Sequence, residues 1–149
     1  MVSVEAMLGL TTRFQVSIDG VNLGGWARCS GLGVNFHPTF QPEGGNYQYQ
    51  TVMPGRIEYT KVSLARAMSA QDSAVVQGWL RNRAQNWAPA ANSGNGSTAE
   101  IKLLDAHKNP VASWSLRNVF PESWTGPDLD AMTFGVAVEK LVLVHEGFL

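Results

Sequence analysis

The sequence predicts a mainly β domain with one helix, and three observations support this prediction. Apolar and polar residues alternate with a period of two along much of the chain, between short turn signals. One stretch, 69–84, instead has the apolar spacing of an amphipathic helix. With 149 residues, 15 glycines and 5 tryptophans, the composition fits a single core and favours strands and turns over a helical bundle.

The N-terminal part of the chain predicts a β-meander of three strands. They are expected at 12–19, 22–30 and 32–37, with Asp19-Gly20 and Gly31 supplying the turns between them. The residues before them, 1–11, do not have a strand pattern, and we expect them to form an N-terminal arm outside the core.

The stretch 38–55 is too long and too rich in Pro, Gly, Asn and Gln for a tight turn. It predicts a long inter-strand loop without regular structure, and loops of this length are usually functional or disordered. The loop nevertheless contains apolar residues that a solvent-facing segment would not need, namely Phe40, Tyr47, Tyr49 and Met53.

A long strand is predicted over 56–68, and its buried face changes halfway. In the first half we expect Ile57 and Tyr59 in the core and the polar residues Arg56, Glu58 and Thr60 on the opposite face. Beyond Lys61 the apolar residues take the other parity, at Val62 and Leu64. Such a strand is bent, or it passes from one environment into another.

The predicted helix, 69–84, has a start signal as well as a periodic pattern. Ser69 can cap it, and Asp72 stands where a capping box has its acidic residue. Its expected core-facing stripe consists of Val75, Val76, Trp79 and Leu80. The residues that follow, 86–98, are expected to form a flexible connection.

A hairpin is predicted next, with strands at 99–106 and 109–120 and a turn at 105–109. Its core candidates are Ile101, Leu103, Trp114 and Leu116.

The closing strand, 133–146, is apolar on both parities. Phe134, Val136, Val138, Val142 and Val144 share one side, and Ala137, Leu141 and Leu143 share the other. A strand buried on both faces normally belongs to a parallel α/β sheet, but one helix is too few for that. We therefore expect the second face to pack against another subunit.

Charge and composition exclude several classes of function. The net charge is −1 and the 11 Lys and Arg residues are scattered, which is unlike the basic stripe of a nucleic-acid-binding protein. No apolar run reaches the length of a membrane helix, and the N-terminus lacks signal-peptide character, so we expect cytoplasmic synthesis without a membrane anchor. Cys29 stands alone, which favours a small buried hydrophobe in a reducing compartment.

No catalytic, cofactor-binding or metal-binding set is predicted. The three histidines are far apart and lack ligand spacing, and no serine lies in a G-x-S-x-G pattern. The sequence Gly31-Leu32-Gly33 lacks the helix that a dinucleotide site requires. Asp128 and Asp130, which follow Gly126-Pro127, are interpreted as turn residues rather than as an acid–base pair.

A set of ordered motifs resembles a known family. They are FQVSIDG, GGWARCSGLG, a Pro-Gly-Arg before a long strand, a Trp-x-Gly-Pro-Asp-Leu turn and the terminal VAVEKLVLVHEGF. From about Thr12 to Phe148, the chain resembles the tail tube (inner tube) proteins of contractile phage tails and of phage-tail-like contractile injection systems.

This resemblance implies a small antiparallel β-barrel or sandwich with one flanking helix. It further implies that six copies form a ring, and that rings stack into a hollow tube that conducts DNA or protein cargo. The implied partners are a sheath protein, baseplate or hub proteins and tube-terminating proteins, in a phage tail or an injection particle. The alternatives are a type VI secretion tube protein and a small β-barrel ligand-binding module.

Within such a tube, three sets of residues are predicted to make contacts. The inter-ring set is Val4, Met7, Leu8, Phe40, Tyr47, Tyr49 and Met53. The inter-subunit set on the closing strand is Val142 and Val144. The set expected to face the lumen or a neighbouring subunit is Arg56, Glu58 and Thr60.

Overall fold

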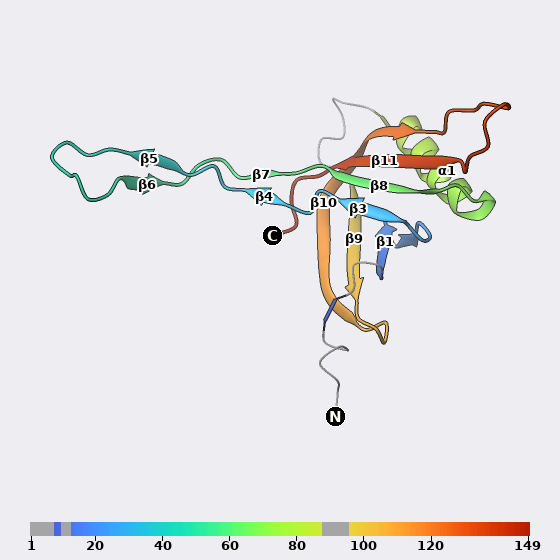
Figure 1. Cartoon of the computed structure of the whole chain (residues 1–149), viewed down its shortest axis with the longest axis horizontal. Coiled ribbons are helices and arrows are strands. Elements are labelled where there is room, and N and C mark those ends of the chain that lie inside the picture. The colour runs from blue at the N-terminus through green and yellow to red at the C-terminus, as the bar shows by residue number, and fades with distance from the viewer. Residues whose placement is uncertain (1–7, 10–12, 88–95) are drawn as a thin grey trace.

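The computed structural model describes residues 8–9, 13–87 and 96–149. The elements in chain order are β1 (Phe14–Ile18), β2 (Val21–Asn22), β3 (Arg28–Ser30), β4 (Val34–Asn35), β5 (Thr39–Gln41), β6 (Thr51–Met53), β7 (Glu58–Tyr59), β8 (Val62–Ala67), α1 (Ala70–Gln85), β9 (Ser97–Leu104), β10 (Pro110–Thr125) and β11 (Val138–Val144). The predicted mainly β fold with one flanking helix is confirmed (Figure 1).

The main sheet has seven strands in the order β2-β1-β9-β10-β11-β8-β3, and its strand pairs are antiparallel. Strand β10 belongs to both halves of this sheet, and its register shifts between Leu116 and Val119 and again between Pro121 and Ser123. Bulges of this kind bend a strand. As a result, β9 and the first part of β10 run across the direction of β8 and β11 (Figure 1).

The core lies between the two halves of this bent sheet, as in a small sandwich. One half contributes the buried residues Val16, Ile18, Ile101 and Leu116, and the other contributes Val62, Leu64, Leu141 and Leu143. Of the four core candidates in the β9–β10 hairpin, Ile101 and Leu116 are buried, whereas Leu103 and Trp114 are partly exposed. The hairpin turn forms as predicted, because Asp105 Oδ1 accepts hydrogen bonds from the backbone of His107 (2.8 Å) and Asn109 (2.9 Å).

Helix α1 packs on the core with part of the predicted stripe. Val76 is buried and Trp79 and Leu80 pack against the core, but Val75 is exposed, so its place in the stripe was wrong. Ser69 caps the helix by accepting a hydrogen bond from the Asp72 backbone N–H at 3.2 Å.

The reciprocal bond of a capping box comes from a different residue than expected, because Ser73 Oγ rather than the Asp72 carboxylate accepts from the Ser69 N–H. The predicted flexible segment 86–98 lies largely outside the described residues, and its last two residues, Ser97 and Thr98, belong to β9.

The predicted β-meander is wrong. Strand β1 pairs with β2 as expected, but β3 pairs with β8 and β4 pairs with β7. The expected strand 22–30 is broken, since Gly24 has a φ of +88° and the chain leaves the sheet there. Gly31, with a φ of +94°, passes so close to the Lys61 carbonyl that a Cβ would lie 1.9 Å from its oxygen.

Residues 34–59 form an extended hairpin, here called the arm, that projects from the body (Figure 1). Near the body β4 pairs with β7, and farther out β5 pairs with β6. The prediction of an irregular loop over 38–55 was therefore wrong. Gly44, Gly45 and Asn46 form the tip, where Gly45 has a φ of +85°, whereas Gly55 lies against the His37 carbonyl on the opposite side of the hairpin.

The predicted strand 56–68 is divided between two sheets, with β7 in the arm and β8 in the main sheet. This division explains the change of parity, because β8 buries Val62 and Leu64 while the arm has no core of its own. The expected burial of Ile57 was wrong: 53% of it is exposed. Tyr59 is half-buried at the base of the arm.

The closing strand begins at Val138 rather than at 133. Residues 126–137, here called the connection, leave the end of β10 and return to β11 on the side of the molecule away from the arm (Figure 1). Phe134, Val136 and Ala137 therefore lie outside the strand and are exposed.

Candidate assembly surfaces

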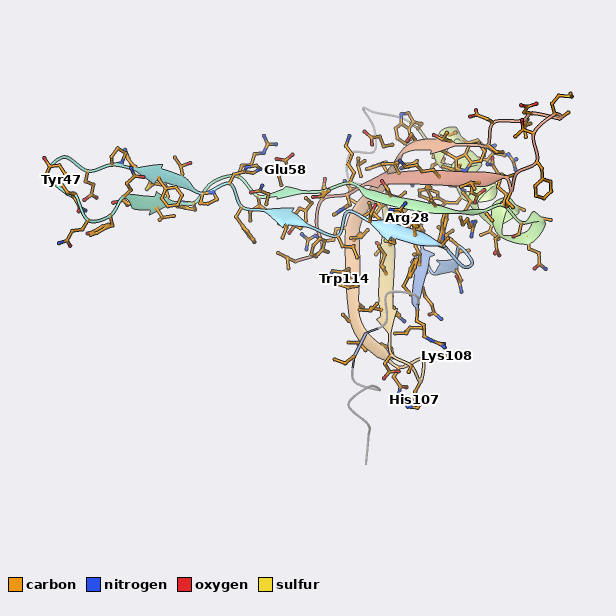
Figure 2. The ribbon with its side chains drawn as sticks, in the orientation of Figure 1. Arg28, Tyr47, Glu58, His107, Lys108 and Trp114 are labelled. Carbon is orange, nitrogen blue, oxygen red and sulfur yellow. The ribbon has the colours of Figure 1, made fainter. Side chains whose placement is uncertain are left out.

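The arm presents apolar side chains that the subunit itself does not cover. Tyr47, at its far end in Figure 2, is 98% exposed. The other exposed large apolar residues of the arm are Phe36, Phe40, Tyr49, Val52, Met53 and Ile57. Apolar surface gathered on a projection marks an interaction site.

The tip of the arm is held by local hydrogen bonds. Asn46 Oδ1 accepts from the Gln48 N–H at 3.1 Å, and the Asn46 N–H donates to the Glu43 carbonyl at 3.1 Å. The Thr51 hydroxyl donates to the Glu43 carboxylate at 2.6 Å, which joins the start of β6 to the turn that follows β5. These bonds fix the direction in which the tip presents its tyrosines.

The base of the arm is clamped by residues 145–148. The Tyr59 ring lies 5.6 Å from the His145 ring and 5.1 Å from the Phe148 ring, measured between centroids. Gly147, with a φ of +136°, passes so close that a Cβ would lie 2.6 Å from the Tyr59 ring. The clamp therefore sets the angle at which the arm leaves the body.

His145 in this clamp is arranged for its neutral form. Its Nδ1 accepts from the Gly147 N–H at 3.1 Å, so the proton lies on Nε2, which donates to the Thr60 carbonyl at 3.1 Å. Burial lowers the pKa of His145, the Thr60 bond opposes this effect and the Arg117 charge adds to it.

The three residues predicted to face the lumen or a neighbour lie at the base of the arm, and all three are exposed. Glu58 accepts from His37 Nε2 at 2.8 Å, a pair that joins β7 to the segment between β4 and β5. Arg56 and Thr60 flank β7 on either side. The structure places Arg56 and Glu58 on the arm and Thr60 directly after it, and none of the three belongs to the main sheet.

The two outer faces of the main sheet differ in character. The face of β1, β9 and the first part of β10 carries polar residues, namely Gln15, Ser17, Glu100, Lys102, Ser113 and Ser115. The face of β8 and β11 carries Ser63, Ala65, Ala67, Val138, Lys140, Val142 and Val144.

Val142 and Val144 are half-buried on this second face, while Glu139, Leu141 and Leu143 point into the core. The apolar second face of the closing strand is therefore real, although shorter than predicted. Because small side chains surround the valines, another layer of protein can approach this face closely.

A buried ion pair, which sequence reasoning missed, supports the same strands. Arg66 Nε lies 2.8 Å from Glu139 Oε1, and the two residues are cross-strand partners on β8 and β11. Arg66 also donates to the carbonyls of Leu23 and Asp72, and its guanidinium lies 4.0 Å from the centre of the Trp26 ring. The pair thus ties β8 and β11 to the start of α1 and to the segment after β2.

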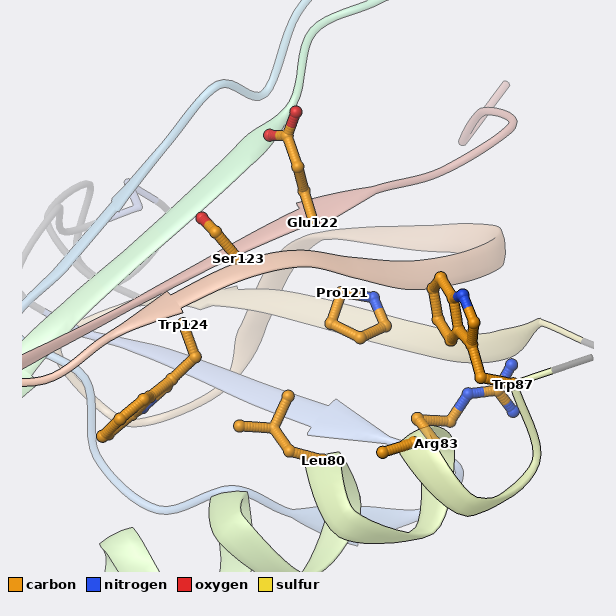
Figure 3. A pocket seen from close by; sticks show the side chains of 8 residues that line it. Leu80, Arg83, Trp87, Pro121, Glu122, Ser123 and Trp124 are labelled. Carbon is orange, nitrogen blue, oxygen red and sulfur yellow. The ribbon is translucent and has the colours of Figure 1, made fainter.

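A cavity of about 510 Å³ lies between α1 and β10 (Figure 3). It is lined by Leu80, Arg83, Ala84, Trp87, Pro121, Glu122, Ser123 and Trp124. Within the described parts of the chain, no group of three or more His, Cys, Asp or Glu side chains could hold a metal ion. Cys29 is partly buried, and burial raises its pKa to about 11, which disfavours the reactive thiolate.

Among the described residues, no helix is long and apolar enough to cross a membrane.

Comparison with known proteins places these surfaces in context. Residues 10–149 match the family model described as T4-like virus tail tube protein gp19. The chain belongs to this tail tube family. No curated protein sequence matches it.

The fold of this tail tube protein recurs in solved contractile assemblies. A chain of the sheath–tube complex of an extracellular contractile injection system, PVC, in its extended state, matches with a TM-score of 0.70 and 21% identity, over 93% of this chain and 88% of that one. A chain of the six-fold symmetrised baseplate of the anti-feeding prophage matches with a TM-score of 0.72 and 19% identity, over 93% and 92%. A chain of the tube-terminating cap of that particle matches with a TM-score of 0.72 and 24% identity, over 99% and 92%.

The tail tube protein's predicted inter-ring residues fall into two groups. Phe40, Tyr47, Tyr49 and Met53 all lie exposed on the arm, and Leu8 is also exposed. Val4 and Met7 lie outside the described residues.

Proposed function

We propose that this tail tube protein is the structural inner-tube subunit of a contractile particle, in which six copies form a ring and rings stack into a hollow tube. One observation carries the proposal: a member of this family leaves uncovered two separate apolar surfaces, the arm and the β8–β11 face. A ring and a stack are two different kinds of contact, because ring contacts close and stacking contacts do not, and each kind needs surface that the single subunit leaves uncovered.

The β8–β11 face supplies the contact within the ring. Val142 and Val144 are half-buried in the subunit, and a neighbour in the ring would cover the remainder. Removing apolar area from water stabilises association by roughly 25 cal/mol per Å² before the costs of ordering.

The arm supplies the contact between rings, through Phe40, Tyr47, Tyr49 and Met53. Residues 1–11, with Val4, Met7 and Leu8, contribute to the same stacking. The arm suits this role because its paired strands extend beyond the body while its base is clamped by His145 and Phe148 (Figure 1).

The tube would conduct DNA or protein cargo and would be driven through a target envelope by contraction of a sheath. Arg56, Glu58 and Thr60 are proposed to face the lumen or a neighbouring subunit. The partners proposed are a sheath protein, baseplate or hub proteins and a tube-terminating protein, because similar folds occur in assemblies of those kinds. The particle would be a phage tail or an extracellular injection system, assembled from subunits made in the cytoplasm.

The two alternatives receive less support. The family match is with tail tube proteins, so a type VI secretion tube protein is not favoured. A ligand-binding module would rely on the hollow in Figure 3, which is broadly open to solvent, whereas ligand sites bury most of the ligand's surface.

Negative-stain electron microscopy of the purified protein, with analytical ultracentrifugation, tests the proposal. Rings with six subunits, or tubes, are the expected result. Dispersed monomers at high concentration that a small ligand stabilises against heat would instead favour the binding module.

A further inference from the structure

We propose that the connection, residues 126–137, is the surface that receives the arm of a subunit in the adjacent ring. This inference rests on the proposed stacking role of the arm and adds its receptor.

The connection is the second apolar projection of the subunit. Leu129 is 89% exposed, Met132 is 93% exposed and Phe134 is 100% exposed. Val136 follows at 71%. Large apolar side chains this exposed, close together on one short segment, indicate a contact that the isolated subunit lacks.

The connection is also ordered by its own hydrogen bonds. Asp130 Oδ1 accepts from the Met132 N–H at 2.9 Å, and Asp130 Oδ2 accepts from the Thr133 hydroxyl at 2.9 Å. The Met68 N–H donates to the Ala137 carbonyl at 2.9 Å, which fixes the end of the connection to the end of β8. The apolar side chains are therefore presented on a preorganised turn, which lowers the entropic cost of binding.

The position of the connection suits a receptor for the arm. Along the longest axis of the molecule the arm occupies one end and the connection lies toward the other (Figure 1). In an open head-to-tail stack, the two contacting surfaces differ and face opposite directions, so that each subunit binds one neighbour with each.

The chemistry of the two projections is complementary. The arm offers exposed aromatic rings, and the connection offers the Met132 thioether and the Phe134 ring, which make favourable contacts with aromatic groups. The connection has two carboxylates, Asp128 and Asp130, and no Lys, Arg or His. The phenol groups of Tyr47 and Tyr49 can donate hydrogen bonds to such carboxylates, and donation to an ionised acceptor is roughly twice as strong as a neutral bond.

Cysteine crosslinking tests this contact directly. Two variants, Tyr47→Cys and Phe134→Cys, are each made in a Cys29→Ala background, mixed, assembled and oxidised. The expected product is a crosslinked dimer that forms in tubes and is absent from either variant alone. His107→Cys, at the exposed turn between β9 and β10 (Figure 2), replaces Phe134→Cys as the matched control and should give no dimer with Tyr47→Cys.

A second variant, Met132→Ala with Phe134→Ala, checks the energetic role of the connection. Both side chains are exposed, so the melting temperature of the subunit should not change, whereas assembly should stop at single rings. The inference is overturned if the double alanine variant forms full-length tubes and Tyr47→Cys with Phe134→Cys gives no more dimer than the His107→Cys control. In that case arm-shortened protein should still fail to stack, which leaves the proposed role of the arm standing. Full-length tubes from arm-shortened protein would overturn the stacking role of the arm, and this inference with it.

Discussion

Arg66 and Glu139 form an ion pair in the interior of the subunit. Both are almost fully buried, and one bond from Arg66 Nε to Glu139 Oε1 accompanies the bonds from Arg66 to backbone carbonyls. Removing one partner leaves an uncompensated buried charge, which typically costs about 3–5 kcal/mol. The same loss at an exposed pair costs about 0–1 kcal/mol.

We therefore expect Glu139→Ala to lower the free energy of unfolding by about 3–5 kcal/mol, as measured by urea denaturation under conditions that keep the subunit monomeric. The matched control is Lys61→Met, which breaks the exposed Lys61–Glu122 pair and should cost about 1 kcal/mol or less. Equal losses in the two variants would contradict the role given to the buried pair.

His145 predicts a dependence of subunit stability on pH. Its folded pKa lies below its ordinary value of 6.5, so the unfolded chain binds the proton more tightly. The contribution of His145 to stability is therefore present above pH 6.5 and is lost as the pH falls through the lower, folded pKa. Protonation would also place a second N–H against the Gly147 N–H, beside the Arg117 charge.

The measurement is the melting temperature between pH 7.5 and pH 5 for the wild-type protein, His145→Gln and His107→Gln. The difference between wild type and His145→Gln should shrink as the pH falls, whereas exposed His107→Gln should follow the wild type throughout. A constant difference across this range would show that the clamp does not depend on neutral His145.

At the scale of elements, the outer face of β11 is tested by placing a charge on it. Val142→Asp or Val144→Asp should abolish rings, because an unpaired charge in an apolar contact costs several kcal/mol. Ser115→Asp, on the polar outer face of β10, is the matched control and should leave rings intact. Hexamers of either valine variant at the wild-type concentration, seen by analytical ultracentrifugation, would refute the assignment.

The arm is tested by shortening 38–55 to a tight turn that joins β4 directly to β7. Folding should change little, since closing a loop depends only weakly on its length and the arm contributes no buried residue to the core. Growth should stop at single rings, as seen by electron microscopy of protein co-expressed with its sheath and baseplate partners. Full-length tubes would refute the stacking role.

Periodicity predicted the elements that face the core and failed for those that do not. The β9–β10 hairpin and the parity of Leu141 and Leu143 follow from the burial of alternate residues. The arm has no core to face, so the alternation around Ile57 and Tyr59 did not mark fully buried positions, and the glycines and amides of 38–55 were interpreted as a loop. The pairing of β3 with β8 joins distant segments, which no local pattern specifies.

Among the predicted site residues, Val142, Val144 and the aromatic residues of the arm lie on surfaces that the subunit leaves at least partly open. The sequence did not, however, predict that residues 126–137 project from the body. Phe134 and Val136 are spaced two residues apart in line with Val138, so they were interpreted as part of the same strand, which in fact begins at Val138. A signal for Arg66 and Glu139 was present, because each charged residue stands at the buried parity of its strand. Two opposite charges at buried positions of neighbouring strands predict a pair once the pairing of the strands is known.

For the whole molecule, the two edges of the main sheet have a consequence for how a tube grows. Those edges are β2 and β3, with two and three residues. Edges this short offer few free backbone groups, so the main sheet gives free subunits little means of polymerising by strand addition. Elongation should then show a lag phase in light scattering that sheared tube fragments abolish, because fragments supply the receptive ends that single subunits cannot. Immediate growth without such seeds would show that nucleation is not the slow step.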